Sequence, residues 1–216
     1  MVWFFQFFFL FCAAAIMRIA WKNLNIKQLL KSTELQQQVA FCALAVFFLW
    51  TLKTGIQPGL EVHFLGLTAL TLMLGWRLGV LVAPIALIAL TGFGIYPWHD
   101  FGVNLLLGII FPISFSYLVF LLTYSYLSRH LFVYIFIAGF FNAALTIVVQ
   151  MFVFALYYKL LGTYPWRVII NDYFSIVLLM LFPEGVLNGM CIAVLVTYKP
   201  EWVLTFLDRD YLHEKS

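Results

Sequence analysis

Five acidic and imidazole side chains stand at the ends of long apolar runs, where they could bind a metal ion. Glu61 and His63 open one run, His99 and Asp100 are adjacent before another, and Asp172 precedes a third. Imidazole and carboxylate together suit a divalent transition metal such as Co, Ni or Zn. The spacings match no established metal motif. The alternatives are solvated loop residues for His99 and Asp100, and a hydrogen-bonded structural histidine for His63.

A second group of polar residues lies inside the apolar runs. Glu184 follows Pro183, which tends to kink a helix, and Asn188 lies one turn further on. An ionisable group at the centre of a membrane helix costs about 2.5 to 3.5 kcal/mol on insertion scales, so Glu184 is a functional candidate. We expect an intramembrane polar cluster of Glu184, Asn188, Asn104 and Asn142, with Glu184 and Asn188 facing a cavity. The alternative is that Glu184 is protonated or bonded to Asn142 and only locks the helices together.

Two pairs of glycines four residues apart are candidates for close helix packing. Gly185 and Gly189 lie beside Glu184, and Gly75 and Gly79 flank Arg77 at an expected tight turn. Small residues at this spacing let two membrane helices approach closely.

The elements that must position these residues are membrane helices. Of the 216 residues, 65% are hydrophobic and 10% are charged, whereas soluble domains carry about a quarter charged residues. The runs are solidly apolar, which favours helices over a barrel. We predict an all-α membrane protein, one polytopic domain over residues 1–216, with about seven transmembrane helices. The predicted spans are 2–20, 36–52, 62–76, 78–95, 102–127, 131–157 and 173–198.

The positive charges predict the orientation of the chain. Nine of the 12 Lys and Arg residues fall in one set of alternate loops, and only Lys53, Lys159 and Arg167 fall in the other. Because cytoplasmic loops retain positive charge, we expect the N-terminus outside and the C-terminus inside a bacterial inner membrane. All five candidate metal ligands then lie at the outer face. The polar segment from Lys22 to Gln38 is either a short amphipathic helix or a solvated linker.

The remaining features exclude several functions. The formal net charge of +3 gives no argument for nucleic acid, and the three cysteines stand apart in apolar runs, so we expect neither a disulfide nor a thiolate metal site. There is no nucleotide-binding glycine-rich loop, so any ATP hydrolysis would need separate subunits. An intramembrane enzyme that uses Glu184 as an acid or base is a third hypothesis, but no nucleophile and base stand at a recognisable spacing.

Three stretches together resemble the membrane permease of cobalt/nickel-type energy-coupling-factor (ECF) transporters, the CbiM/NikM family. They are PGLEVHFLGLTALTLMLGWRLGVLVA (58–83), LTGFGIYPWHDFGVNLLLGIIFP (90–112) and LFPEGVLNGMCIAVLVTYKPEW (181–202). The resemblance implies a seven-helix bundle that captures a divalent metal, Co or Ni, from outside. It also implies a scaffold transmembrane subunit and two cytoplasmic ATPases as partners, and no cofactor beyond the transported ion.

The chain departs from this family at the metal site. The family's ligands include an N-terminal histidine, but here the chain begins MVWFFQFFF and has no histidine before His63. Of the family's ligands, only His63 therefore carries over by motif. Either Glu61, His99 and Asp100 complete a rebuilt set, or the substrate differs, or the protein is a structural or accessory membrane protein that does not transport.

Overall fold

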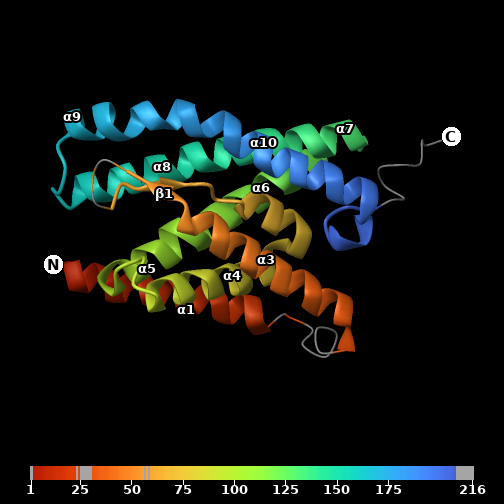
Figure 1. Ribbon diagram of the computed structural model, residues 1–216, viewed down its shortest axis with the longest axis horizontal. Coiled ribbons are helices and arrows are strands. Elements are labelled where there is room, and N and C mark those ends of the chain that lie inside the picture. The colour runs from red at the N-terminus through yellow and green to blue at the C-terminus, as the bar shows by residue number, and fades with distance from the viewer. Residues whose placement is uncertain (1, 23, 25–30, 56, 58, 208–216) are drawn as a thin grey trace.

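The fold is a bundle of helices that run roughly along one axis (Figure 1), as seen in a computed structural model. The structure describes residues 2–22, 24, 31–55, 57 and 59–207. The long helices are α1 (Val2–Lys22), α3 (Thr33–Thr51), α4 (Leu67–Gly92), α6 (Phe111–Tyr126), α8 (Asn142–Leu160) and α10 (Ser175–Tyr198). Shorter helical segments precede three of them: α5 (Phe101–Val103) and η2 (Asn104–Ile110), α7 (Leu131–Val133) and η3 (Tyr134–Phe141), and α9 (Trp166–Val168) and η4 (Ile169–Phe174).

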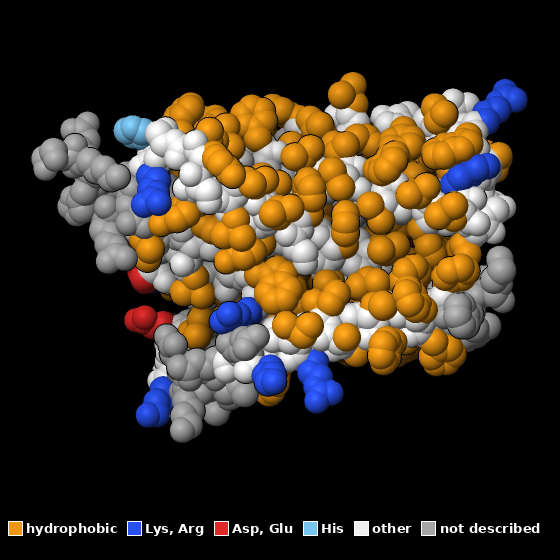
Figure 2. Space-filling view, turned by 180° about the vertical axis from the view of Figure 1, so that it is seen from behind, with side chains coloured by type: hydrophobic (Ala, Val, Ile, Leu, Met, Phe, Trp, Pro, Cys, Tyr) orange, Lys and Arg blue, Asp and Glu red, His pale blue; other side chains and the backbone are white. Residues whose placement is uncertain are grey.

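Five helical stretches in the described part of the chain are long and apolar enough to cross a membrane. They are Phe5–Lys22, Leu67–Gly92, Trp98–Tyr126, Leu131–Leu160 and Trp166–Tyr198. Large hydrophobic side chains cover much of the outer surface between the two ends of the bundle, as lipid requires (Figure 2). The all-helical membrane fold predicted from the composition is therefore confirmed.

The predicted third and fourth spans are not separate full-length helices, so the count of seven is not confirmed. Both belong to α4, which is broken at Gly75, where φ is +71°. Residues 62–66 are not helical, and residues 67–74 form a helix of only eight residues. At 1.5 Å per residue this half-helix is about 12 Å long, less than half of a ~30 Å hydrocarbon layer. The sequence is apolar throughout this region, and hydropathy does not report where a helix begins. The start of the helix at Leu67 was therefore not predicted.

The predicted polar segment between the first two spans is only partly described. Residues 23 and 25–30 lie outside the described residues. From Thr33 onward the segment belongs to α3, and Ser32 accepts a hydrogen bond from the Leu35 N–H at 3.2 Å as its N-cap. The glutamines at its end are therefore part of a long helix.

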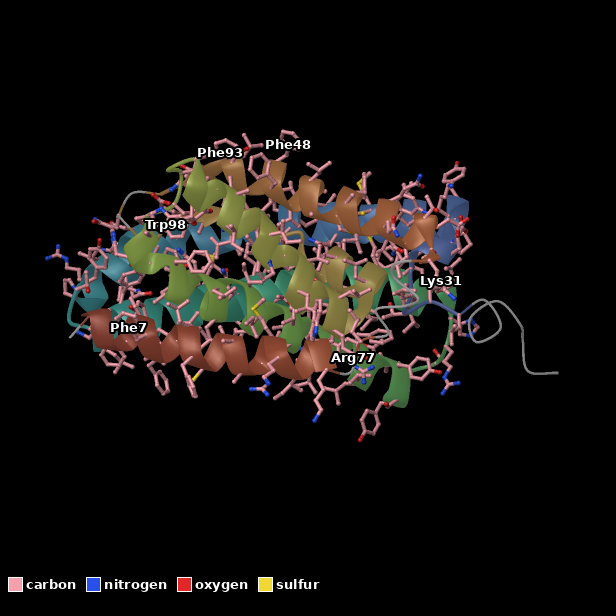
Figure 3. The ribbon with its side chains drawn as sticks, turned by 90° about the horizontal axis from the view of Figure 1, so that it is seen from below. Phe7, Lys31, Phe48, Arg77, Phe93 and Trp98 are labelled. Atoms are coloured by element: carbon pink, nitrogen blue, oxygen red, sulfur yellow. The ribbon has the colours of Figure 1, made fainter. Side chains whose placement is uncertain are left out.

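The bundle has two sides with α6 between them. α8 and α10 run together on one side, α1 and α4 pack on the other, and α6 contacts both α4 and α8 (Figure 1). A small hairpin of β1 (Lys53–Thr54) and β2 (Val62–His63) lies at the same end as α5 and α9, with Lys53 paired to His63. Figure 3 shows Trp98 toward this end and Lys31 and Arg77 toward the other.

The half-helix of α4 is held at its C-terminal end by distant parts of the chain. The backbone N–H groups of Leu204 and Thr205 donate to the carbonyls of Met73 and Leu72 at 3.0 and 3.3 Å. The Gln38 side chain also donates to Met73 O, at 3.0 Å. The segment after α10 therefore packs under the half-helix, at the end of the bundle opposite the hairpin.

Candidate functional site

A cavity of about 540 Å³ lies beside the hairpin, and four of the five residues proposed as metal ligands line it. Glu61, His63, His99 and Asp100 all line it, and so does Asn104. Its volume falls within the roughly 300 to 1,000 Å³ that is usual for small-molecule sites. Chain folding thus brings together residues from two loops that their sequence spacing did not connect.

His63 is held in one tautomer at the cavity wall. Its Nδ1 lies 3.0 Å from the Phe64 carbonyl oxygen. A carbonyl can only accept, so Nδ1 carries the proton and Nε2 carries the lone pair that a metal would need. The ring lies 5.3 Å from Trp50 and 6.4 Å from Tyr96, measured between ring centroids. Burial lowers the pKa of His63 below its usual 6.5, and the charge of Lys53 lowers it further.

The lowered pKa predicts how stability depends on pH. Between the native pKa and the unfolded value of about 6.5, the unfolded chain binds more protons at His63 than the native protein does, so stability falls as pH decreases through this window. We expect the imidazole signals of His63, assigned by their loss in His63→Gln, to stay those of the neutral ring at pH 6.5 in an NMR titration. A midpoint at or above pH 6.5 would contradict this prediction.

The two acidic candidates at the cavity already have partners. Glu61 accepts from Lys53 Nζ at 2.5 Å, and the same ammonium donates to Ile95 O at 3.0 Å and lies 4.6 Å from the centre of the Tyr96 ring. Asp100 lies 3.4 Å from His99 Nε2. A metal at Glu61 would therefore compete with an ammonium group.

The candidate ligands share a cavity but not a coordination sphere. Within the described ranges, no three His, Cys, Asp or Glu side chains are grouped so that they could hold a metal ion. Asp172, the fifth candidate, does not line the cavity but accepts a hydrogen bond from Gln57 at 2.9 Å, which ties the hairpin loop to η4. The candidate donors therefore line one cavity without forming a ready-made metal site among the described residues.

Sequence reasoning missed most of the cavity wall. Gln150 on α8 lines the cavity, and neither its side chain nor that of Asn104 has a hydrogen bond to the described residues. Tyr96 also lines it, and its buried hydroxyl has no partner in the same part of the chain. The signal for Gln150 was present, since an amide inside an apolar span needs an explanation. The tyrosines gave no such signal, because aromatic residues are common near the ends of membrane helices.

Glu184 and Asn188 do not line this cavity; they anchor the N-terminus of the half-helix. The Glu184 carboxylate accepts from the backbone N–H groups of Leu65 and Gly66, both at 2.9 Å, and from Asn188 Nδ2 at 2.7 Å. Asn188 Oδ1 accepts from the Ala69 N–H at 2.8 Å. The first N–H groups of a helix have no intrahelical partner, and inside a membrane each unsatisfied one costs several kcal/mol.

Glu184 and Asn188, which form this anchor, also hold the backbone next to His63. Leu65 and Gly66 follow His63 by two and three residues, so Glu184 fixes the backbone that carries the imidazole. The Leu65 carbonyl also accepts from Trp50 Nε1 at 3.0 Å. Both side chains of the anchor are buried, and we assign them a positioning role for the His63 loop.

Asn142 belongs to a separate network and does not contact Glu184. Its Nδ2 donates to Ser116 O at 3.0 Å, Ser116 Oγ at 3.1 Å and Ala138 O at 3.1 Å, and its Oδ1 accepts from Thr146 at 3.2 Å. This network joins α6 to α8. The four residues expected in one polar cluster are thus divided between the anchor (Glu184 and Asn188), this network and the cavity wall at Asn104.

The glycine pairs lie at two different kinds of position. A Cβ at Gly185 or Gly189 would lie 3.1 or 3.0 Å from atoms of Phe140, so α10 approaches η3 closely there. A Cβ at Gly79 would lie 3.1 Å from Leu70. Gly75 has open space around it, and its left-handed φ makes the turn between the two arms of α4.

Fold and site together define a multi-pass membrane protein with a binding cavity of small-molecule size near one end of its helices. The cavity, the hairpin and the buried anchor of Glu184 and Asn188 all belong to one helical bundle. The family model for the cobalt uptake substrate-specific transmembrane region, CbiM, matches residues 4–202. The chain therefore belongs to the CbiM family, whose members are membrane components of cobalt uptake. No curated protein and no solved structure is detectably similar to the chain.

Proposed function

We propose that the chain is the substrate-capture subunit of an ECF-type uptake transporter whose cargo is a divalent transition metal, with Co and Ni as the first candidates. Membership of the cobalt-uptake family supports the transport role. The observation that carries the proposal is the cavity beside the hairpin, which is lined by His63, Glu61 and Asp100. Imidazole and carboxylate together suit a divalent transition metal.

The geometry supports capture without catalysis. The lowered pKa of His63 favours its neutral form, and a neutral imidazole binds a metal without first losing a proton. The lining side chains that carry a formal charge at pH 7 are Lys53, Glu61 and Asp100, which leaves the cavity with a net charge of −1 when its histidines are neutral. This charge attracts a cation. Release would follow movement of the bundle relative to a partner subunit, as in transporters with a site between moving elements.

The partners distinguish this function from that of an accessory protein. The accessory alternative is supported by the fact that Glu184, Asn188 and Asn142 hold backbone and helices in place and do not line the cavity. We expect affinity purification from native membranes in mild detergent to recover the chain with a transmembrane scaffold protein and an ATPase. Recovery alone, or only with unrelated assembly factors, would refute the proposed subunit role. A purification from membranes that lack the tagged chain is the control for background.

A further inference from the structure

The first half of α1 holds one amide among apolar residues, and this amide is bonded to the segment that follows the short helix η1 (Trp98–Asp100). Gln6 is the only side chain in residues 2–11 that is not hydrophobic, and it is 5% exposed. Its Oε1 accepts from the backbone N–H groups of Gly102 and Val103, at 3.0 and 3.3 Å. These bonds join α1 to a segment 96 and 97 residues further along the chain.

Gln6 bonds two N–H groups that have no acceptor within their own segment. The N–H groups of the residues on either side, Phe101 and Asn104, donate to carbonyls within the segment. Gly102 and Val103 lie between them and are buried, near the start of a long helical stretch. The first N–H groups of a helix have no intrahelical partner. A carbonyl oxygen has two lone pairs, so the one Gln6 side chain accepts both bonds.

The segment that Gln6 holds forms a large part of the cavity wall. Seven of the 21 described residues that line the cavity lie between Tyr96 and Ile109, and Asp100 and Asn104 are among them. None of the described residues of α1 lines the cavity; α1 packs against α5 and η2 (Figure 1). Gln6 therefore bonds the backbone directly between two side chains of the cavity without reaching the cavity itself.

The other loop of the cavity is held by the same kind of bond. Glu184 accepts from the consecutive N–H groups of Leu65 and Gly66, next to His63. Gln6 does the same for the second loop from the opposite end of the chain. Each loop that carries candidate ligands is therefore fixed by one buried side chain with an acceptor oxygen.

We propose that Gln6 is a positioning residue for the cavity, which keeps Asp100 and Asn104 in place on its wall by fixing the backbone between them. This role rests on the proposed function, since it takes the cavity as the place of capture. Gln6 needs only its oxygen for the role, because its buried Nε2 has no hydrogen-bond partner among the described residues. A side chain of the same length that keeps an acceptor oxygen should therefore replace it, and one without the oxygen should not.

Gln6→Met and Gln6→Glu, in the purified full-length protein, test the role of the oxygen at nearly constant side-chain length. In Gln6→Met, hydrogen–deuterium exchange followed by NMR should become about five- to tenfold faster at Gly102 and Val103, equivalent to the loss of one hydrogen bond. Isothermal titration calorimetry should show cobalt(II) chloride binding about fivefold or more weakly, because a loosened wall is less well preorganised. Gln6→Glu should restore both values, since it keeps the acceptor.

Gln38→Met is the matched control for the loss of a buried amide. Gln38 is also buried, and its Nε2 donates to Met73 O at 3.0 Å, at the end of the bundle opposite the hairpin. This variant should lower the melting temperature, but it should leave both the exchange at Gly102 and Val103 and the affinity for cobalt unchanged.

Gly102→Ala tests the same contact from the other side. An added Cβ would lie 2.7 Å from the Gln6 backbone oxygen and 2.9 Å from its Oε1, so α1 and the segment must move apart. The same loss of cobalt binding is expected. Gly92→Ala is the control for this variant, because nothing lies within 4 Å of the Cβ position at Gly92.

Three results would overturn the role of Gln6. They are unchanged exchange in Gln6→Met, a loss of cobalt binding that Gln6→Glu does not restore, and an equal loss of binding in Gln38→Met. Faster exchange with unchanged cobalt affinity would also overturn it, because the fixed backbone would then not matter for capture. If the unaltered protein binds no cobalt, the proposed cargo is refuted, and the exchange rates alone decide whether Gln6 fixes this backbone.

Discussion

Replacing Glu184 with alanine is expected to destabilise the protein by about 3 to 6 kcal/mol. The substitution leaves the buried N–H groups of Leu65 and Gly66 without acceptors and deprives Asn188 of one. Each buried unsatisfied group costs about 1 to 3 kcal/mol. Thermal unfolding in detergent, followed by circular dichroism, measures the loss. Glu184→Gln should give an intermediate loss, since the amide keeps one acceptor oxygen and shape.

A double-mutant cycle separates the anchor from nonspecific damage. Glu184→Ala and Asn188→Ala break the same network, so their combined effect should be clearly smaller than the sum of the two single effects. Glu201→Ala is the control, because Glu201 is exposed and its ion pair with Lys199 is long at 4.0 Å. Additive losses, or an unchanged melting temperature for Glu184→Ala, would show that the carboxylate does not hold the half-helix.

Replacing Gly59 with alanine is expected to open the hairpin loop and weaken substrate binding at least tenfold. Gly59 has φ of +79°, and an added Cβ would lie 2.1 Å from the Tyr158 hydroxyl oxygen, so the loop or the tyrosine must move. Both residues line the cavity. The left-handed backbone adds about 1 to 2 kcal/mol for a residue with a side chain. Isothermal titration calorimetry with cobalt(II) chloride measures the effect on binding.

Gly94→Ala is the matched control for this substitution. Gly94 has nearly the same φ, +75°, but nothing lies within 4 Å of its Cβ position. It should show the backbone strain without the collision, and therefore a small loss of stability with binding retained. If both variants bind equally well, the contact between Gly59 and Tyr158 does not shape the cavity.

The sequence predicted the residues of the candidate site better than it predicted which groups those residues contact. The cost of an ionised group in a membrane identified Glu184, but its partners are backbone groups 119 and 118 residues away, which no local pattern reveals. His63, Glu61, His99 and Asp100 were expected at one face, and they do line one cavity. The pairing of Glu61 with Lys53 depends on the hairpin register, and that register was not readable from a two-residue strand.

The helix boundaries show a similar limit. Composition alone identified a helical membrane protein, because no soluble fold could bury so many apolar residues. Apolar character continues from residue 62 through the break at Gly75, so hydropathy did not reveal that residues 62–66 are not helical. The N–H groups of Leu65 and Gly66, just before the helix begins, bond to Glu184 on α10, and no local pattern reveals such a tertiary contact. Hydropathy therefore found the membrane region but not the half-helix inside it.

The half-helix of α4 is secured at both ends by the same C-terminal part of the chain. α10 holds its first N–H groups through Glu184 and Asn188, and the segment after α10 holds its last carbonyls through Leu204 and Thr205. A short helix that is hydrogen-bonded at both ends is held firmly in place. The half-helix begins at Leu67, four residues after His63, and its last carbonyls meet the segment after α10 at the end of the bundle opposite the hairpin. The loop that carries His63, the half-helix and the C-terminal part of the chain are therefore joined by one continuous set of hydrogen bonds.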